Sequence, residues 1–157
     1  MNDFYIKCLK SEKVESGSIY GQFVIKFLRP GQGITIGNLF RRVLLSDLEG
    51  TAITGVRIAG VRDEFSTIPG IREDILEILL NLKGIILKNK TSDPKVGRLK
   101  IKGPAIVTAS SIELPANLEI INPNHYVATI STSNVLEIEL KIESGTGYKL
   151  ADQTFCN

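Results

Sequence analysis

Residues 31–50 read GQGITIGNLFRRVLLSDLEG, a glycine-rich turn followed by an apolar segment of helical periodicity. At about 100° per residue, the apolar side chains of a helix over residues 36–48 cover about half of its circumference, whereas a core-facing stripe spans roughly 100°. The apolar arc contains Ile36, Leu39, Phe40, Val43, Leu44 and Leu48. Leu45 falls outside this arc, and Arg41 and Arg42 flank it. We therefore expect one apolar face to pack on the chain's own sheet and another to pack on a second subunit.

The remaining sequence predicts strands around one further helix. Residues 71–83 have helical periodicity, begin after Pro69-Gly70 and end at Lys83-Gly84. Apolar runs bounded by turn residues predict strands over residues 5–9, 20–27, 51–61, 85–89, 98–102, 118–121, 126–131 and 135–142. Strands grouped around only two helices favour an α+β fold over alternating βαβ units.

The glycines around the first helix invite a phosphate-binding interpretation. Gly31, Gly33 and Gly37 lie between a predicted strand and the helix, and Gly50 follows the helix. A dinucleotide-binding turn needs its third glycine one position earlier, and a P-loop needs Gly-Lys-Ser/Thr at the start of the helix. The spacing therefore favours a structural turn, with Gly50 closing the helix as a C′ residue.

Composition narrows the class of protein. The chain has 157 residues, a net charge of +2, 43% hydrophobic residues and 23% charged residues, which is typical of a globular domain rather than of a dedicated nucleic-acid binder. Cys8 and Cys156 have no CxxC motif or histidine nearby, so neither a disulfide framework nor a zinc site is supported. No apolar run approaches the roughly 20 residues of a membrane span, and the start has no signal pattern, so we expect no membrane association.

The sequence offers no catalytic constellation. Glu64 stands beside the hydroxyls of Ser66 and Thr67, but no base or metal ligand completes a known motif there. The single histidine, His125, lies in a Pro-Asn turn where we expect it to be exposed. We therefore expect no catalytic residues, no cofactor and no small-molecule substrate.

Several motifs occur together in the order found in one family. They are GQGxTxGN at residues 31–38, RRVLLS at 41–46, EFSTIPG at 64–70, EDILEILLNLK at 73–83, GPAxVTA at 103–109 and GxGY at 145–148. Together they resemble the amino-terminal domain of the bacterial-type RNA polymerase alpha subunit. Within that family, the residues of the motifs are most similar to those of the cyanobacterial and plastid branch. The family usually has histidine where this chain has Asp63.

The resemblance implies a two-lobed architecture. Residues 1–49 would form the first part of a dimerisation lobe, with strands and an interface helix. Residues 50–157 would form most of an inserted, β-rich lobe. The returning part of the dimerisation lobe and the carboxy-terminal DNA-binding domain of the family have no counterpart in this sequence, which would make it truncated.

The resemblance also implies roles for individual residues. The apolar arc of the first helix would form a homodimer interface with a second alpha subunit. The docking surface for the large β and β′ subunits would contain Arg41, Arg42 and Leu45 of the first helix, together with Glu77 and Lys83. Glu77 and Lys83 lie off the apolar stripe of the second helix, which is formed by Ile71, Ile75, Ile78, Leu79 and Leu82. Both could also be ordinary solvated residues, and a lysine near a helix end is favoured by the helix dipole.

The expected function is therefore that of a non-catalytic scaffold subunit of a DNA-directed RNA polymerase. It would assemble the enzyme and contact DNA only indirectly, through the complete polymerase, in the plastid (chloroplast) stroma or in the cytoplasm of a cyanobacterium. Two alternatives remain open from the residues themselves. One is a small nucleotide-binding enzyme that uses the turn from Gly31 to Gly37, and the other is a free-standing homodimeric adaptor.

Overall fold

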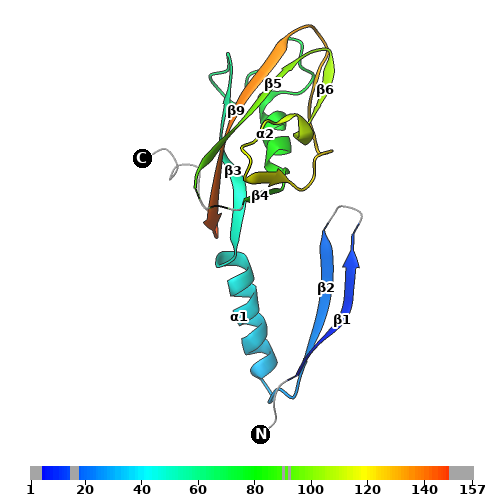
Figure 1. Ribbon diagram of the computed structural model, residues 1–157. Helices are drawn as coiled ribbons and strands as arrows, with labels where there is room; N and C mark the ends of the chain where they lie inside the picture. Colours follow the sequence, from blue (N-terminus) through cyan, green and yellow to red (C-terminus); the bar gives the residue numbers. More distant parts are fainter. Residues whose placement is uncertain (1–4, 15–17, 90, 92, 149–157) are drawn as a thin grey trace. The chain divides into compact units, whose positions relative to one another are not determined.

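The computed structural model describes residues 5–14, 18–89, 91 and 93–148 (Figure 1). The chain divides into two compact units, Met1–Leu48 and Glu49–Asn157, and the division falls one residue before the predicted boundary. The chain folds into a mixed α+β structure, as the sequence predicts. Cys156 lies outside the described residues.

The first unit consists of a β-hairpin and one helix. Strands β1 (Tyr5–Lys13) and β2 (Ile19–Lys26) pair antiparallel, with a bulge between Cys8 and Lys10. Helix α1 (Gln32–Ser46) follows. None of the described side chains of this unit is buried.

Three expectations about α1 are wrong. The helix begins at Gln32 rather than at residue 36, because Gly31 adopts a left-handed φ of 86° at the N-cap and both Gly33 and Gly37 are accommodated within the helix. It ends at Ser46, with the Asp47 amide donating to the Val43 carbonyl. Gly50 therefore does not close the helix but belongs to the next strand. No side chain of α1 is buried, so the expected packing of one face on a sheet is not found within the helix's own unit.

The second unit is built on a five-stranded sheet. Its strand order is β5-β9-β3-β4-β7, and every pairing is antiparallel. The strands are β3 (Glu49–Ile58), β4 (Leu87–Asn89), β5 (Lys95–Lys102), β7 (Leu118–Ile120) and β9 (Val135–Thr146). A separate two-stranded sheet pairs β6 (Ala105–Thr108) with β8 (Tyr126–Ile130), and a short 3₁₀ helix (Ala109–Ser111) follows β6. Strand β6 is absent from the sequence prediction, since Gly103-Pro104 indicated only a turn.

Helix α2 (Ile75–Lys83) begins four residues later than predicted. The Asp74 side chain caps it by accepting a hydrogen bond from the Glu77 amide at 2.7 Å. The preceding residues are instead extended along β8, where the Arg72 amide donates to the Thr129 carbonyl and Ile71 bridges to Ile130. Ile71 is therefore outside the helix.

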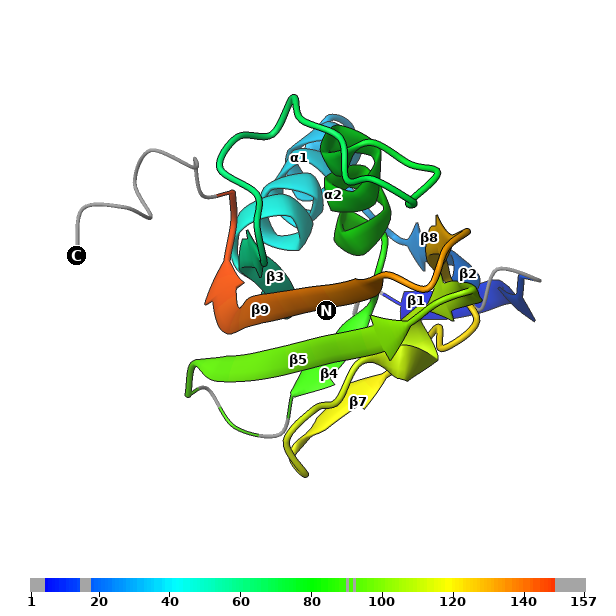
Figure 2. The same cartoon turned by 90° about the horizontal axis from the view of Figure 1, so that it is seen from above.

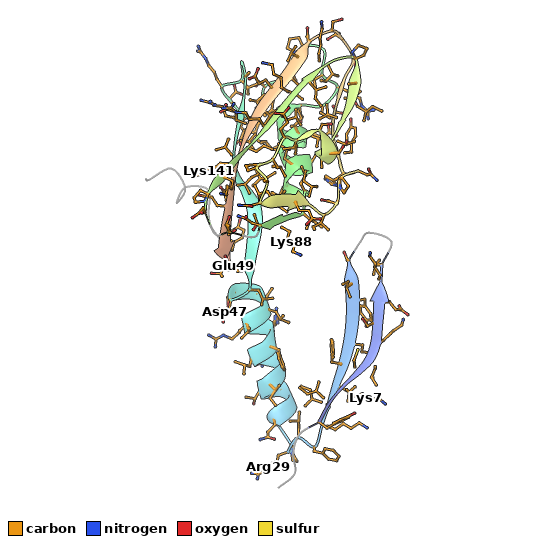
Figure 3. The ribbon with its side chains drawn as sticks, in the orientation of Figure 1. Lys7, Arg29, Asp47, Glu49, Lys88 and Lys141 are labelled. Atoms are coloured by element: carbon orange, nitrogen blue, oxygen red, sulfur yellow. The ribbon has the colours of Figure 1, made fainter. Side chains whose placement is uncertain are left out.

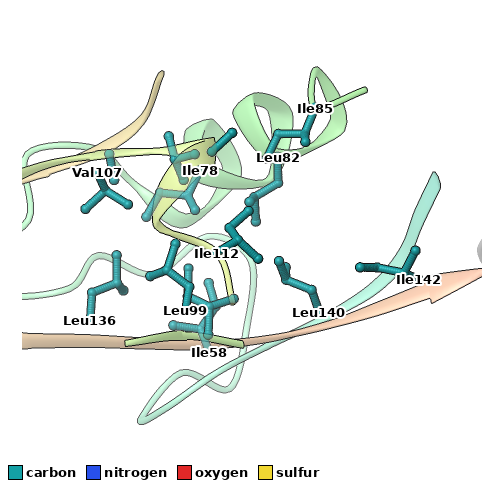
Figure 4. Packing of buried hydrophobic residues seen from close by; sticks show 14 of the residues in the cluster. Ile58, Ile78, Leu82, Ile85, Leu99, Val107, Ile112, Leu136, Leu140 and Ile142 are labelled. Carbon is teal, nitrogen blue, oxygen red and sulfur yellow. The ribbon is translucent and has the colours of Figure 1, made fainter. Parts of the chain in front are cut away.

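The core of the second unit lies between α2 and the sheet (Figure 2). Ile78 and Leu82 of α2 face the sheet residues Leu99, Leu136 and Leu140, and all five are at most 1% exposed (Figure 4). On β9 the buried residues alternate with polar ones, which is the pattern of a strand covered on one face. Every buried apolar side chain in the described part of the chain belongs to this unit.

The outer face of the sheet carries paired charges. Glu139 of β9 forms ion pairs with Arg57 of β3 and, at 3.7 Å, with Arg98 of β5. Lys100 pairs with Glu137 at 2.9 Å across the same strands. Lys141, labelled in Figure 3, pairs with Glu143 at 3.0 Å within β9. This face is therefore solvated, while the opposite face is packed.

Candidate subunit interface

The predicted dimer residues of α1 are accessible in the first unit. Leu39 and Leu44 are each 61% exposed, Phe40 is 50% exposed and Val43 is 37% exposed. Ile36 is half-buried. Leu48 is exposed as well, but it lies after the end of the helix rather than on it. An apolar surface of this kind is typical of an interaction site.

The predicted docking residues of α1 are also accessible. Arg41 and Arg42 are exposed, and neither forms an ion pair with any residue that the structure describes. Leu45 is 70% exposed. The Ser46 hydroxyl donates to the Arg42 carbonyl at 2.6 Å, a bond that uses the backbone of Arg42 and not its side chain. Both guanidinium groups are thus available to carboxylates on another chain.

Glu77 and Lys83 lie on the exposed side of α2 in the second unit. The backbone of Glu77 is held by the Asp74 cap, and Lys83 is the last residue of the helix. The predicted inner positions Ile75, Ile78 and Leu82 are buried, so Glu77 and Lys83 point away from the core. The predicted docking residues are therefore divided between the two units.

A buried carboxylate, which sequence reasoning missed, organises the segment before α2. Glu73 is only 2% exposed and accepts hydrogen bonds from the Tyr126 hydroxyl and, at 2.7 Å, from the Thr129 amide. Arg72 lies 3.8 Å from the same carboxylate. Tyr126 lies 53 positions away in the chain, so no local pattern around Glu73 could have indicated this contact.

These hydrogen bonds decide the ionisation of the network. Burial alone would raise the pKa of Glu73, but the bonds from Tyr126 and Thr129 outweigh it and hold the pKa of this carboxyl below its ordinary value. Burial, followed by the bond to Glu73, raises the pKa of the Tyr126 phenol. Glu73 is therefore a charged anchor that fastens residues 72–74 to β8.

His125 differs from its predicted environment. It is half-buried, and its Nε2 lies 2.9 Å from the Asn81 carbonyl at the end of α2, so the expectation of an exposed side chain is wrong. This contact gives His125 a structural role, because it joins the end of α2 to the turn formed by residues 122–125. Among the residues that the structure describes, no cluster of His, Cys, Asp and Glu could hold a metal ion, and no helix is long and apolar enough to cross a membrane.

Comparison with known proteins identifies the family. Residues 56–155, more than half of the chain, match the model of the RNA polymerase Rpb3/RpoA insert domain. The chain belongs to this family. It is 86% identical over 156 residues to the DNA-directed RNA polymerase subunit alpha of Trieres chinensis and 69% identical over 154 residues to that of Thalassiosira pseudonana.

The same similarity extends beyond these two relatives. The alpha subunit of Trichodesmium erythraeum is 53% identical over 154 residues. In each of the three alignments at least 98% of this chain is matched, so the similarity includes the first unit as well as the insert domain. The chain spans about half the length of these relatives, from 49% to 50%.

Proposed function

We propose that the chain is a non-catalytic structural subunit of a DNA-directed RNA polymerase. It pairs with a second alpha subunit through the apolar arc of α1 and docks the β and β′ subunits. The observation that carries this proposal is the exposure of α1, which is apolar over two faces yet buries no side chain in its own unit. High identity to alpha subunits supports the assignment to a polymerase.

The polarity around the arc supports two separate roles for the helix. Its apolar centre, represented by Phe40 and Leu44, suits a self-complementary contact with a second copy. The flanking Arg41 and Arg42 suit bidentate pairing with carboxylates on a different partner. The proposed location is the plastid stroma, because the similar proteins include alpha subunits from algae; a cyanobacterial cytoplasm is the alternative.

Pairing is tested by placing a charge on the apolar arc. In analytical ultracentrifugation the apparent mass of the wild-type chain should rise with concentration. The Leu44→Glu variant should stay monomeric, because pairing would place two carboxylates in an apolar contact. Leu80→Glu is the matched control, since Leu80 is also 61% exposed but lies on α2. A wild-type chain that stays monomeric at every concentration would contradict the pairing role.

Docking of the large subunit is tested at Arg42. Arg42→Ala should weaken capture of the purified β subunit by about 2–5 kcal/mol, because the partner carboxylate is left desolvated and unpaired. This corresponds to a loss of affinity from about thirtyfold to several thousandfold. Thermal unfolding should change little, since alanine favours the helix and Arg42 is exposed. Arg29→Ala removes the same charge outside the helix and serves as control; equal capture of β by the Arg42 variant and the wild type would exclude this contact.

A further inference from the structure

One local sequence pattern occurs twice in the second unit and has two different structural outcomes. Val-Arg-Asp-Glu at residues 61–64, the first stretch, and Ile-Arg-Glu-Asp at residues 71–74, the second stretch, share an apolar residue, an arginine and two acidic residues. Both lie in the segment that connects β3 to α2. Glu73 of the second stretch is 2% exposed, whereas the corresponding Asp63 of the first stretch is exposed. Because the local sequences are so alike, the difference comes from their tertiary contacts.

The second stretch is fastened to β8 and to the residues that follow it. The Arg72 amide donates to the Thr129 carbonyl at 3.0 Å. The Gly70 carbonyl, just before this stretch, accepts a bond from the Ser131 amide at 2.8 Å. Gly70 has a left-handed φ of 83°, and a Cβ at this position would collide with the side chain of Thr132. The backbone at Gly70 is therefore held both by its conformation and by its neighbours.

The first stretch is held mainly by its own turn. The Phe65 amide donates to the Asp63 carboxylate at 3.1 Å, and the Ser66 hydroxyl donates to the Asp63 carbonyl at 2.9 Å. In the part of the chain that the structure describes, Arg62 and Glu64 form no ion pair and no hydrogen bond with α2 or β8. This turn is therefore stabilised by itself rather than by the sheet.

The glycine that precedes the first stretch is free to turn. Gly60 has a left-handed φ of 79°, similar to that of Gly70, but a Cβ at Gly60 would have no atom within 4 Å apart from its chain neighbours. Phe65 is 80% exposed, and Val61 is the apolar residue of the first stretch that packs against the core. Few contacts therefore have to break for this part of the connection to move.

Residues 61–66 also border a hollow instead of a packed interior. The hollow has a volume of about 420 Å³ and is lined by residues 59–63 and 66–69, all of them from the connecting segment. Side chains that border a hollow lack the dispersion contacts of a packed core on that side. Residues 61–64 also line a groove of about 690 Å³ between β3 and α2. A movement of these residues therefore changes the shape of that groove.

We propose that residues 61–66 form a hinged arm. The arm turns about Gly60 and opens as a unit of its own, while residues 67–74 stay fixed on β8. In the closed state it is held by its own turn and by one bond to α2, from the Ile75 amide to the Ser66 carbonyl at 3.3 Å. Opening breaks this bond and changes the width of the groove without unfolding the sheet. The arm is a property of the second unit and does not depend on the proposed function.

Hydrogen exchange of single amides tests the arm in the wild-type chain. Phe65 and Arg72 are a matched pair, since both residues are exposed and both amides donate a hydrogen bond, at 3.1 Å and 3.0 Å. The Phe65 amide should be at least about a hundredfold less protected than the Arg72 amide, and low concentrations of urea should not change its exchange. The Arg72 amide should exchange faster as urea is added, because its exchange requires the second unit to unfold. No protection at all at Phe65, or the same urea dependence for both amides, would overturn the proposal.

A mild core variant separates opening of the arm from unfolding of the second unit. Ile78 is fully buried, and Ile78→Val removes a single methylene group from the core. Exchange of the Arg72 amide should become about twofold to tenfold faster, because the folded second unit is less stable. Exchange of the Phe65 amide should stay unchanged, because the arm opens without disturbing this core. An equal acceleration of both amides would show that the arm opens only when the sheet unfolds.

Trypsin, which cleaves after basic residues, compares the two stretches directly. The bonds Arg62-Asp63 and Arg72-Glu73 have the same kinds of residue on both sides, so a digest of the unfolded chain in urea should cut both at similar rates. In the folded chain the cut after Arg62 should be at least about tenfold faster than the cut after Arg72, because cleavage requires an opened segment. Equal rates in the folded chain, or a faster cut after Arg72, would show that the arm is not a separate unit.

Discussion

The two units use similar apolar side chains in opposite ways. In the second unit Ile78, Leu99 and Ile138 are fully buried between α2 and the sheet. In the first unit Leu39, Leu44 and Leu45 are all more than 60% exposed on a single helix. The difference shows that apolar composition alone does not identify a core. The second unit contains both surfaces of its main contact, whereas the apolar surface of α1 has no counterpart that buries it within the described residues of the first unit.

The largest expected effect tests the core of the second unit. Ile78→Ala should lower the free energy of unfolding by about 2–5 kcal/mol, because it leaves a cavity at a fully buried position. Leu44→Ala on α1 should change it by less than about 0.5 kcal/mol, as an exposed position does. The two free energies are compared by urea unfolding of both variants at micromolar protein concentration. A large loss of unfolding free energy for Leu44→Ala would show that Leu44 is buried in a contact in solution.

An intermediate effect is expected from the buried anchor. Glu73→Gln should cost about 1–3 kcal/mol at neutral pH, because the amide accepts the Tyr126 and Thr129 bonds less well than a carboxylate. The pKa of Glu73 in the folded chain lies below its ordinary value of 4.5, so this contribution is complete above that value and disappears as the pH falls through the folded-state pKa. Glu77→Gln, at an exposed position of α2, is the control.

The pH dependence of Glu73→Gln can be read from urea midpoints between neutral and acidic pH. The wild type and the variant should converge on the acidic side of the transition. A gap of constant size at every pH would show that the carboxylate charge contributes nothing and that Glu73 acts only through its shape. Such a result would make the second unit an apolar core without a charged anchor.

The smallest expected effect concerns the solvated face of the sheet. Lys100→Ala should cost less than about 1 kcal/mol, because its pair with Glu137 is exposed and screened. Thermal melting at low and high salt should show a difference between wild type and variant that shrinks as salt rises. A larger or salt-independent loss of stability would mean that the outer face of the sheet is partly shielded from solvent.

The elements that sequence reasoning located best are those with strong periodicity. Ile75, Ile78 and Leu82 were predicted on the inner face of the second helix and are buried. The sequence predicts too late a start for α1 because Gly33 and Gly37 indicate a turn, yet the helix contains both glycines at a cost of roughly 0.5–1 kcal/mol each.

Long-range contacts account for most of what the sequence did not indicate. The partners of Glu73 lie 53 and 56 positions away, and residues 71–72 follow β8 instead of extending the helix. The short pairing between β3 and β4 depends on where β4 stops, which is a property of tertiary packing and not of either strand's own pattern. The roles predicted for Arg41, Arg42, Glu77 and Lys83 stay predictions.

The pairing of β3 with β9 sets an order of events during synthesis. Thr51 and Ser144, whose hydroxyls lie 2.9 Å apart, are separated by 93 positions in the chain. At about 5–20 residues per second, β3 leaves the ribosome roughly 5–20 s before the strand that completes it. Strand β4, whose Leu87 pairs with Thr51, is synthesised well before β9, so only the β9 edge of β3 is without its partner during the whole interval. Until β9 is made, the nascent second unit therefore exposes one long unpaired strand edge, together with apolar side chains that the finished sheet covers.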